Sequence, residues 1–196
     1  MDHSELRALL ELIGMLFTDP RTGVLIALLL AAAVSDYRSF RIPNWLTVGG
    51  LVFGTVYNIL EPPVHGAGWM FPASGIATGF GLMFPFYLMR AVGAGDVKLL
   101  AMAGAFLGWN DTLYALLFSF VVGGVAALAF AAYHGLMRRL LDNTRMLLCY
   151  LTLSAIGGQR PTVQLAPSQS AGKLAFGVSI AAATIGEVVA RQLGFI

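Results

Sequence analysis

The sequence predicts an all-α, polytopic membrane protein with about six transmembrane helices plus an N-terminal amphipathic interfacial helix. Composition is the first reason. Of the 196 residues, 58% are hydrophobic and only 11% are charged, whereas a soluble domain needs about 25% charged residues to cover its surface. Periodicity is the second reason, because apolar runs recur at lengths near the roughly 20 residues that a helix needs to span a bilayer.

The first segment, residues 1–17, predicts a helix that lies along the membrane surface. Its apolar residues recur at helical spacing, which is typical of an interfacial helix; they are Leu6, Leu9, Leu10, Ile13 and Phe17. Three acidic residues accompany a single arginine here, whereas a secretory signal begins with positive charge. We therefore expect residues 1–21 to be retained as an amphipathic helix and linker, followed by a six-helix membrane domain over residues 22–196.

Six apolar runs follow. They cover Thr22–Ser35, Trp45–Leu60, Ala73–Arg90, Val97–Trp109, Thr112–His134 and Gly172–Ala190. The third, fifth and sixth are long enough to span, and the second is marginal. The first and fourth are short, and these two lie next to Asp36 and Asp96. Two glycine pairs with three intervening residues, Gly75 with Gly79 and Gly104 with Gly108, predict close packing between helices.

Basic residues predict the orientation, because loops on the cytoplasmic side are enriched in Lys and Arg. With six spans, nine of the twelve basic residues fall on one side: Arg38, Arg41, Arg90, Lys98, Arg138, Arg139, Arg145, Arg160 and Lys173. That side is predicted to be cytoplasmic and includes a loop over about residues 137–171. Asp36 and Asp96 then face the cytoplasm together.

Several classes of function are disfavoured by composition. Basic residues are spread along loops and not clustered, which argues against a nucleic-acid partner. A single cysteine, Cys149, excludes a disulfide framework and a four-cysteine zinc site within this sequence. The three histidines show no metal-ligand spacing, so no metal site and no cofactor are expected.

Asp36 and Asp96 are the candidate functional residues, because ionisable groups at the edge of hydrocarbon are costly and usually mark a function. Two neighbouring carboxylates in a poorly solvated place cannot both ionise easily, so they share a proton. One can then deprotonate water while the other protonates a peptide, as in aspartic proteases. Gly93 and Gly95 would let a substrate backbone approach Asp96.

Simpler structural roles remain open for the same residues. Asp36 could end its helix or pair with Arg38 or Arg41. Asp96 could cap the helix that starts at Val97, and Asp111 suits a similar capping position. Lys98 could tune Asp96 electrostatically or simply extend from a helix end to the membrane surface.

Two segments resemble the motifs of the type IV prepilin peptidases, membrane aspartic proteases of the GxGD type. The first is Asp36-Tyr-Arg-Ser-Phe-Arg-Ile-Pro-Asn44, and the second runs from Gly93-Ala-Gly-Asp-Val-Lys to Gly108. A weaker similarity covers Leu174-Ala-Phe-Gly-Val-Ser-Ile180. The match is to the small variants that serve tight-adherence (Flp) pili.

This resemblance implies that Asp36 and Asp96 form a catalytic pair without a cofactor, supported by Gly93, Gly95, Lys98, Arg41 and Asn44. It implies a multi-pass protein of the bacterial inner membrane whose active site faces the cytoplasm. The implied substrate is a prepilin, cut between its basic leader and its hydrophobic segment, and other pilus assembly components are expected partners. Larger relatives also N-methylate the pilin through a domain with two CxxC pairs, which this sequence lacks, so no methyltransferase activity is expected.

Two other classes of function stay open. A presenilin-like intramembrane protease shares Gly-x-Gly-Asp and carries a tyrosine beside its first aspartate. In this sequence Tyr37 follows Asp36 in the same way. A non-enzymatic transporter or pilus assembly platform could use intramembrane aspartates to carry protons. Transporters often show inverted repeats, and none stands out in this sequence.

Overall fold

The structure is a computed structural model. It describes residue 14 and the ranges 19–63, 68–89, 91–138, 141–142, 144–145 and 175–193. The predicted N-terminal helix lies outside the described residues except for Gly14, and so does most of the predicted loop at 137–171. The chain divides into two compact units, one of residues 1–123 with 175–196 and one of residues 124–174. The first unit contains both candidate aspartates.

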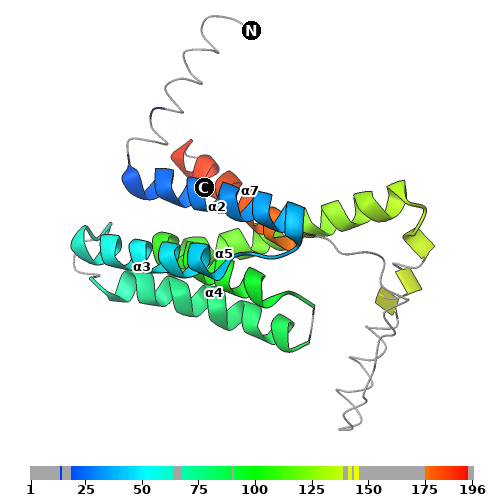
Figure 1. Cartoon of the computed structure of the whole chain (residues 1–196), viewed down its shortest axis with the longest axis horizontal. Coiled ribbons are helices and arrows are strands. Elements are labelled where there is room, and N and C mark those ends of the chain that lie inside the picture. Colours follow the sequence, from blue (N-terminus) through cyan, green and yellow to red (C-terminus); the bar gives the residue numbers. More distant parts are fainter. Residues whose placement is uncertain are drawn as a thin grey trace, which may run out of the picture. The chain divides into compact units, whose positions relative to one another are not determined.

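The described part of the chain is all-helical, which confirms the all-α part of the predicted fold class, whereas the six membrane spans stay a prediction. Its five helices are α2 (Pro20–Ser39), α3 (Asn44–Leu60), α4 (Met70–Leu88), α5 (Ala94–Tyr133) and α7 (Phe176–Gln192). Each overlaps a predicted apolar run, and α5 covers two of them. Helix α2 packs against α7 and α3, and α3 packs against α4; Figure 1 shows α2 and α7 side by side.

Helix α2 begins and ends at local signals in the sequence. Asp19 caps it by accepting a hydrogen bond from the backbone N–H of Arg21 at 3.1 Å, and Pro20 occupies its first turn. The helix stops at Phe40, whose φ of 50° is left-handed and whose N–H returns to the carbonyl of Asp36. These signals place Asp36 in the last turn of α2.

Helix α5 contains a reversal of the chain at Gly108. This residue has φ 75° and ψ −179°, a conformation that is open to glycine and costly for other residues. Asp96, before it, lies near Asp36 at the end of α2, whereas Asp111, after it, pairs with Arg191 at the end of α7. The segment 109–123 then returns, because Gly123 lies against Phe176 at the start of α7.

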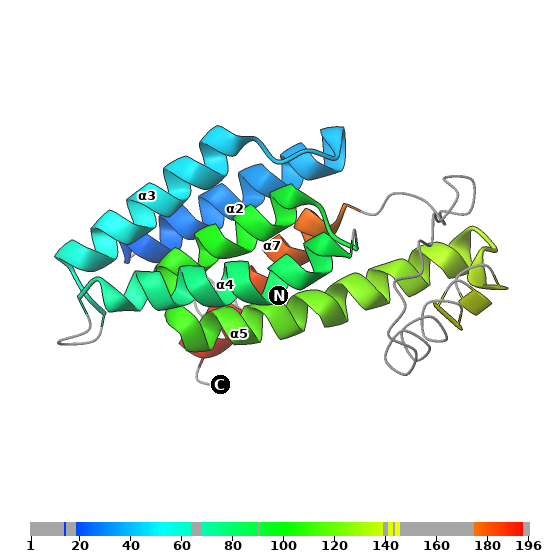
Figure 2. The same ribbon diagram turned by 90° about the horizontal axis from the view of Figure 1, so that it is seen from below.

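The segment 94–107 of α5 forms the centre of the first unit (Figure 2). Its buried residues include Leu99, Leu100, Met102, Ala103 and Ala105, none of which exposes any surface. Contact with α4 is closest at two glycines, since a Cβ at Gly75 would lie 1.9 Å from the carbonyl oxygen of Gly104. The predicted close packing at Gly75 and Gly104 is therefore confirmed.

Asn58 in α3 compensates for the interruption at Gly108. Carbonyls in the last turn of a helix lack partners within the helix, and the Nδ2 of Asn58 donates to the carbonyl of Ala105 at 2.8 Å. Its Oδ1 accepts a hydrogen bond from Arg21 at 3.1 Å. Asn58 is fully buried and cannot bond to solvent. These two contacts therefore give both polar atoms of its amide a hydrogen-bond partner inside the bundle.

We predict that Asn58→Ala lowers the free energy of unfolding by about 1–3 kcal/mol, the cost of leaving a buried polar group without its partner. Thermal unfolding of the purified protein in detergent measures this. Tyr57→Phe is the matched control, because it removes only an exposed hydrogen bond to Glu61 in the same turn of α3. Equal midpoints for the two variants would contradict the assigned role of Asn58.

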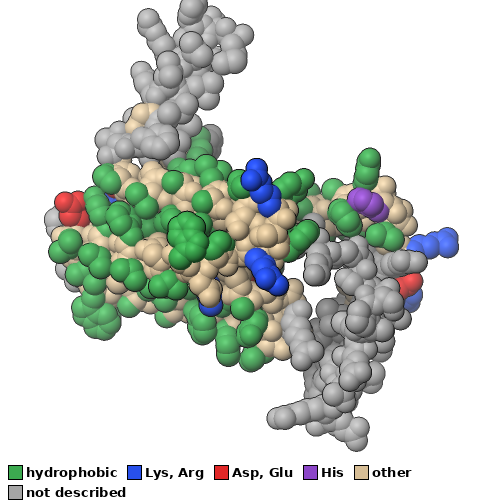
Figure 3. Space-filling model, viewed as in Figure 1, with side chains coloured by type: hydrophobic (Ala, Val, Ile, Leu, Met, Phe, Trp, Pro, Cys, Tyr) green, Lys and Arg blue, Asp and Glu red, His purple; other side chains and the backbone are tan. Residues whose placement is uncertain are grey.

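Among the described residues, three helices are long and apolar enough to cross a membrane, namely α2, α4 and α5. The first unit also exposes many large hydrophobic side chains, among them Val48, Val52, Phe80 and Val121. Figure 3 shows hydrophobic side chains spread over most of the visible face of this unit. Such extensive exposed apolar surface is rare in soluble monomers and suits contact with hydrocarbon.

Candidate active site

Four helix ends meet at one end of the first unit, which we call the aspartate end. Helix α2 ends there, and α3, α5 and α7 begin there, so their polar ends converge. Asp36 comes from α2 and Asp96 from the first turn of α5. Both carboxylic side chains are buried, with 6% and 9% of their residues' surface exposed.

Asp36 is held by the start of α7. Its Oδ2 accepts a hydrogen bond from the backbone N–H of Gly177 at 2.8 Å. Gly177 lies in the first turn of α7, where backbone N–H groups have no partner within the helix and favour a negative charge. The hydrogen bond therefore fixes the position of the carboxyl and links α2 to a helix 141 residues further along the chain.

Asp96 is held by its own loop. Helix α5 begins at Ala94, so the simpler alternative, in which Asp96 is the N-cap of a helix that starts at Val97, does not hold. Its Oδ2 instead accepts from the backbone N–H of Gly93 at 3.0 Å. A third-position carboxylate that reaches back to the residue before the helix is one half of a capping box. The Oδ2 of Asp96 therefore orders the turn before α5, and its Oδ1 takes no part in this hydrogen bond.

The two aspartates are brought to the same place by contacts that share Ile42. Ile42 packs against both Gly95, next to Asp96, and Gly177, which binds Asp36. A Cβ at Gly95 would lie 3.3 Å from the Cβ of Ile42, and a Cβ at Gly177 would lie 2.9 Å from its Cδ1. The loop after α2 thus packs on the start of α5 and on the start of α7 at the same time.

A direct hydrogen bond joins the two predicted motifs. The Nζ of Lys98 donates to the Oδ1 of Asn44 at 3.0 Å, which connects the first turn of α5 to the first residue of α3. Arg41 contributes to the aspartate end through its backbone. Its carbonyl oxygen accepts a hydrogen bond from the hydroxyl of Ser35, in the last part of α2, at 2.8 Å. Its side chain is exposed. Every predicted site residue therefore belongs to the aspartate end.

The sequence prediction missed Gly177 as a site residue, because a backbone N–H donor is not marked by residue type. The weak similarity over Leu174–Ile180 contains this glycine but gave it no role. In the structure the absence of a side chain matters, because a Cβ at Gly177 would lie 2.7 Å from the Oδ2 of Asp36. Tyr37, which kept the presenilin-like reading open, is 76% exposed. Asp111, predicted as a helix cap, instead forms an ion pair with Arg191 at the opposite end of the first unit.

Comparison with known proteins places both aspartates in a recognised family region. A model described as the type IV leader peptidase family matches residues 23–128. A prepilin leader peptidase/N-methyltransferase of Aeromonas salmonicida strain A449 is 33% identical over 129 residues, which cover 61% of this chain and 44% of that protein. The protein of the same name from Escherichia coli K12 is 32% identical over 123 residues, which cover 56% of this chain and 51% of that protein.

The chain thus spans about half the length of the curated relatives it matches. No solved structure matches it.

Proposed function

The chain belongs to the type IV leader peptidase family, and we propose that it is a prepilin leader peptidase that works as a membrane aspartic endopeptidase. Its substrate would be a type IV or Flp prepilin, cleaved between the basic leader and the hydrophobic segment. One observation carries the proposal: two buried aspartates from helices far apart in sequence lie at one end of the bundle. The printed names of the curated relatives support the same reaction.

In this proposal the aspartate end faces the cytoplasm of a bacterial inner membrane. Helix α5 would supply two of six membrane passes, because the chain reverses at Gly108. Arg38, Arg41 and Lys98 lie near the aspartate end, and positive residues favour the cytoplasmic side. A prepilin could then place its hydrophobic helix in the bilayer beside the bundle while its basic leader remains in the cytoplasm.

The proposed chemistry uses the two carboxyl groups in different protonation states. The scissile peptide lies extended near Asp36 and Asp96 with a water molecule between the carboxyls. The ionised aspartate takes a proton from this water as its oxygen attacks the carbonyl carbon, and the protonated aspartate donates a proton to the carbonyl oxygen. The C–N bond of the resulting diol intermediate then breaks as the first aspartate gives its proton to the leaving nitrogen. The second aspartate takes a proton back from one of the two hydroxyl groups, so that a carboxylic acid and a free amine leave and both aspartates return to their starting states.

This mechanism consumes one water and needs no metal or organic cofactor. The hydrogen bonds from Gly93 and Gly177 would keep the carboxyls oriented throughout. Preorganised groups of this kind lower the barrier because they need not be reoriented during the reaction. The proposal covers leader cleavage and not N-methylation, since this sequence carries one cysteine and no CxxC pair.

The direct test is cleavage of a candidate prepilin by the purified protein in detergent. The expected result is two fragments whose masses add up to the substrate plus one water, with the cut between leader and hydrophobic segment. Chelators should leave the rate unchanged. An intact substrate after prolonged incubation with folded protein would contradict the proposed activity.

Lys98 and Asn44 have a positioning role in this proposal. We predict that Lys98→Ala slows cleavage about tenfold, the effect of losing one hydrogen bond to a charged group that holds the two motifs together. Asn44→Ala should have a similar effect. Because both substitutions break the same contact, the double variant should be little slower than either single variant.

Initial rates of cleavage at saturating prepilin measure these effects. Arg38→Ala is the control, because it removes an exposed positive charge near the same end of the bundle without touching this contact. A double variant whose loss is the product of the two single losses would show that Lys98 and Asn44 act separately.

A further inference from the structure

Glu187 in α7 is a buried acid that the proposed peptidase chemistry does not use. Only 2% of its surface is exposed, and its Oε2 has no hydrogen-bond partner within the part of the chain that the structure describes. A carboxylate without a partner in such a place is costly, so buried charges are normally paired or bound to an ion. Glu187 lies ten residues after Gly177, which is about 15 Å along the helix from the aspartate end.

A cavity of about 230 Å³ adjoins this carboxyl group. The charged side chains that line it are Asp19, Arg21, Asp111, Glu187 and Arg191. They come from the start of α2, the middle of α5 and the end of α7, all within the first unit. The cavity therefore marks the end of this unit opposite the aspartate end, and it has room for several water molecules or a hydrated ion.

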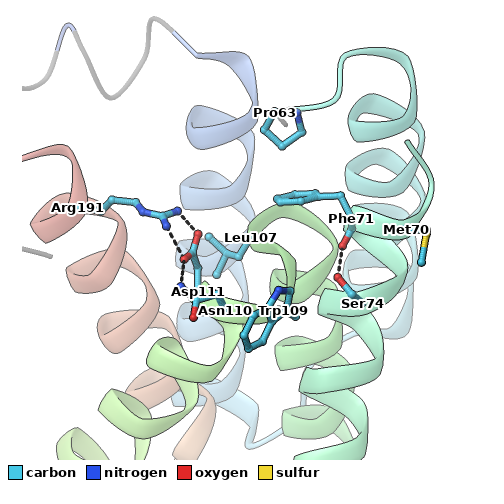
Figure 4. A pocket seen from close by; sticks show the side chains of 9 residues that line it. All are labelled: Pro63, Met70, Phe71, Ser74, Leu107, Trp109, Asn110, Asp111 and Arg191. Carbon is cyan, nitrogen blue, oxygen red and sulfur yellow. Dashed lines mark hydrogen bonds and ion pairs between the residues drawn. The ribbon is translucent and has the colours of Figure 1, made fainter. Parts of the chain in front are cut away.

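Both arginines around the cavity already have acidic partners. Arg191 forms two hydrogen bonds with Asp111, as the dashed lines in Figure 4 show. Arg21 pairs with Asp19 at 3.3 Å, and it also donates to Asn58. Three acids and two arginines leave one negative charge in excess, and Glu187 is the acid without a partner among them.

A second unsatisfied oxygen lies on the same helix. The hydroxyl of Thr184 is fully buried and has no hydrogen-bond partner among the described residues. Residues three apart share one face of a helix, so Thr184 and Glu187 lie on the same face of α7, although only Glu187 lines the cavity. Carboxylate and hydroxyl oxygens with nearby water are suitable ligands for a hard cation.

We propose that Glu187 and Thr184 form a binding site for one monovalent alkali cation, Na⁺ or K⁺, with water in the adjoining cavity completing its coordination. A single excess negative charge matches a monovalent ion. Within the described ranges no group of three or more His, Cys, Asp or Glu residues could hold a metal ion, so the site lacks the carboxylates that a tightly bound divalent ion requires. The bound cation would stabilise α7 where it packs against the start of α2.

Thermal unfolding of the full chain in detergent at neutral pH tests this site. Na⁺ or K⁺ is titrated against N-methyl-D-glucamine at constant ionic strength, so that general screening is unchanged. Because a ligand that binds only the folded state stabilises it, the midpoint for the unaltered chain should rise by about 5 °C at saturation. Glu187→Gln should abolish this rise, and Thr184→Val should shift it to higher cation concentration.

Glu61→Gln is the matched control, because Glu61 is an exposed acid near the same end of the unit, and it should keep the full response. If Glu187→Gln does not fold, Thr184→Val and direct observation of ²³Na⁺ or ³⁹K⁺ relaxation in the unaltered protein decide the question. A midpoint that depends on pH but not on alkali cation would show that Glu187 holds a proton and would overturn the proposal. An equal cation response in all variants would also overturn it.

Discussion

Replacing either Asp36 or Asp96 with asparagine is expected to abolish leader cleavage. Asparagine keeps the size and one oxygen of the side chain, so the hydrogen bonds from Gly177 and Gly93 remain possible. It cannot exchange a proton with water or with the leaving nitrogen. Losing one positioned acid or base costs about 10²–10⁴ in rate, and losing one member of a pair that works as a unit costs nearly as much as losing both.

The measurement is the mass of the prepilin after incubation with each purified variant. Asp19→Asn serves as the control, because it removes a carboxylate from the other end of α2, where Asp19 caps the helix and binds Arg21. That variant should cleave at a rate close to the unaltered protein's, with lower thermal stability. Normal cleavage by either Asp36→Asn or Asp96→Asn would contradict the assignment of the pair.

Gly177→Ala is expected to reduce cleavage about 100-fold while the protein still folds. The added Cβ would lie 2.7 Å from the Oδ2 of Asp36 and 2.9 Å from the Cδ1 of Ile42, so the carboxyl and the loop must both move. A displacement near 1 Å of a reacting group can lower a rate by about this factor. The loss should fall on kcat, because Gly177 acts through Asp36.

Gly186→Ala is the matched control in the same helix, since a Cβ there meets no atom within 4 Å. Cleavage kinetics of the two variants, together with their thermal unfolding midpoints, separate a local effect from a loss of folding. Unchanged kcat for Gly177→Ala would show that the contact between α7 and Asp36 has no part in the reaction.

The helices were largely predictable, because apolar runs and local caps determine them. Asp19 and Pro20 begin α2 as such residues usually begin helices. The turn between the fourth and fifth runs was predicted around residues 110–111, but the chain reverses at Gly108. Glycine at that position suited both close packing and a positive φ, and spacing alone could not distinguish the two.

Within the site, side chains were predictable and backbone contacts were not. Asp36 and Asp96 are acids beside apolar runs, so hydropathy singled them out, and the resemblance to a known family added Lys98 and Asn44. Gly177 donates through its backbone across 141 residues, and nothing in its residue type announces this. The alternative role of Asp96 as an N-cap assumed a helix that starts at Val97, whereas α5 begins three residues earlier, at Ala94.

Buried Glu187 was not predicted either. The sequence shows one acid within an apolar run. It does not show whether the side chain of that acid faces the protein interior or the membrane surface. Only the packing of α7 against α2 places it beside the cavity that Asp111 and Arg191 also line.

Chemical crosslinking of Asp36→Cys with Asp96→Cys tests most directly whether the two positions lie together. In a Cys149→Ser background and in native membranes, a short bismaleimide should join the two cysteines within one chain, which intact mass reveals. Asp36→Cys combined with Asn110→Cys, at the opposite end of the bundle, should not be joined. Reaction of the two cysteines only from opposite sides of the membrane, without any crosslink, would contradict the account.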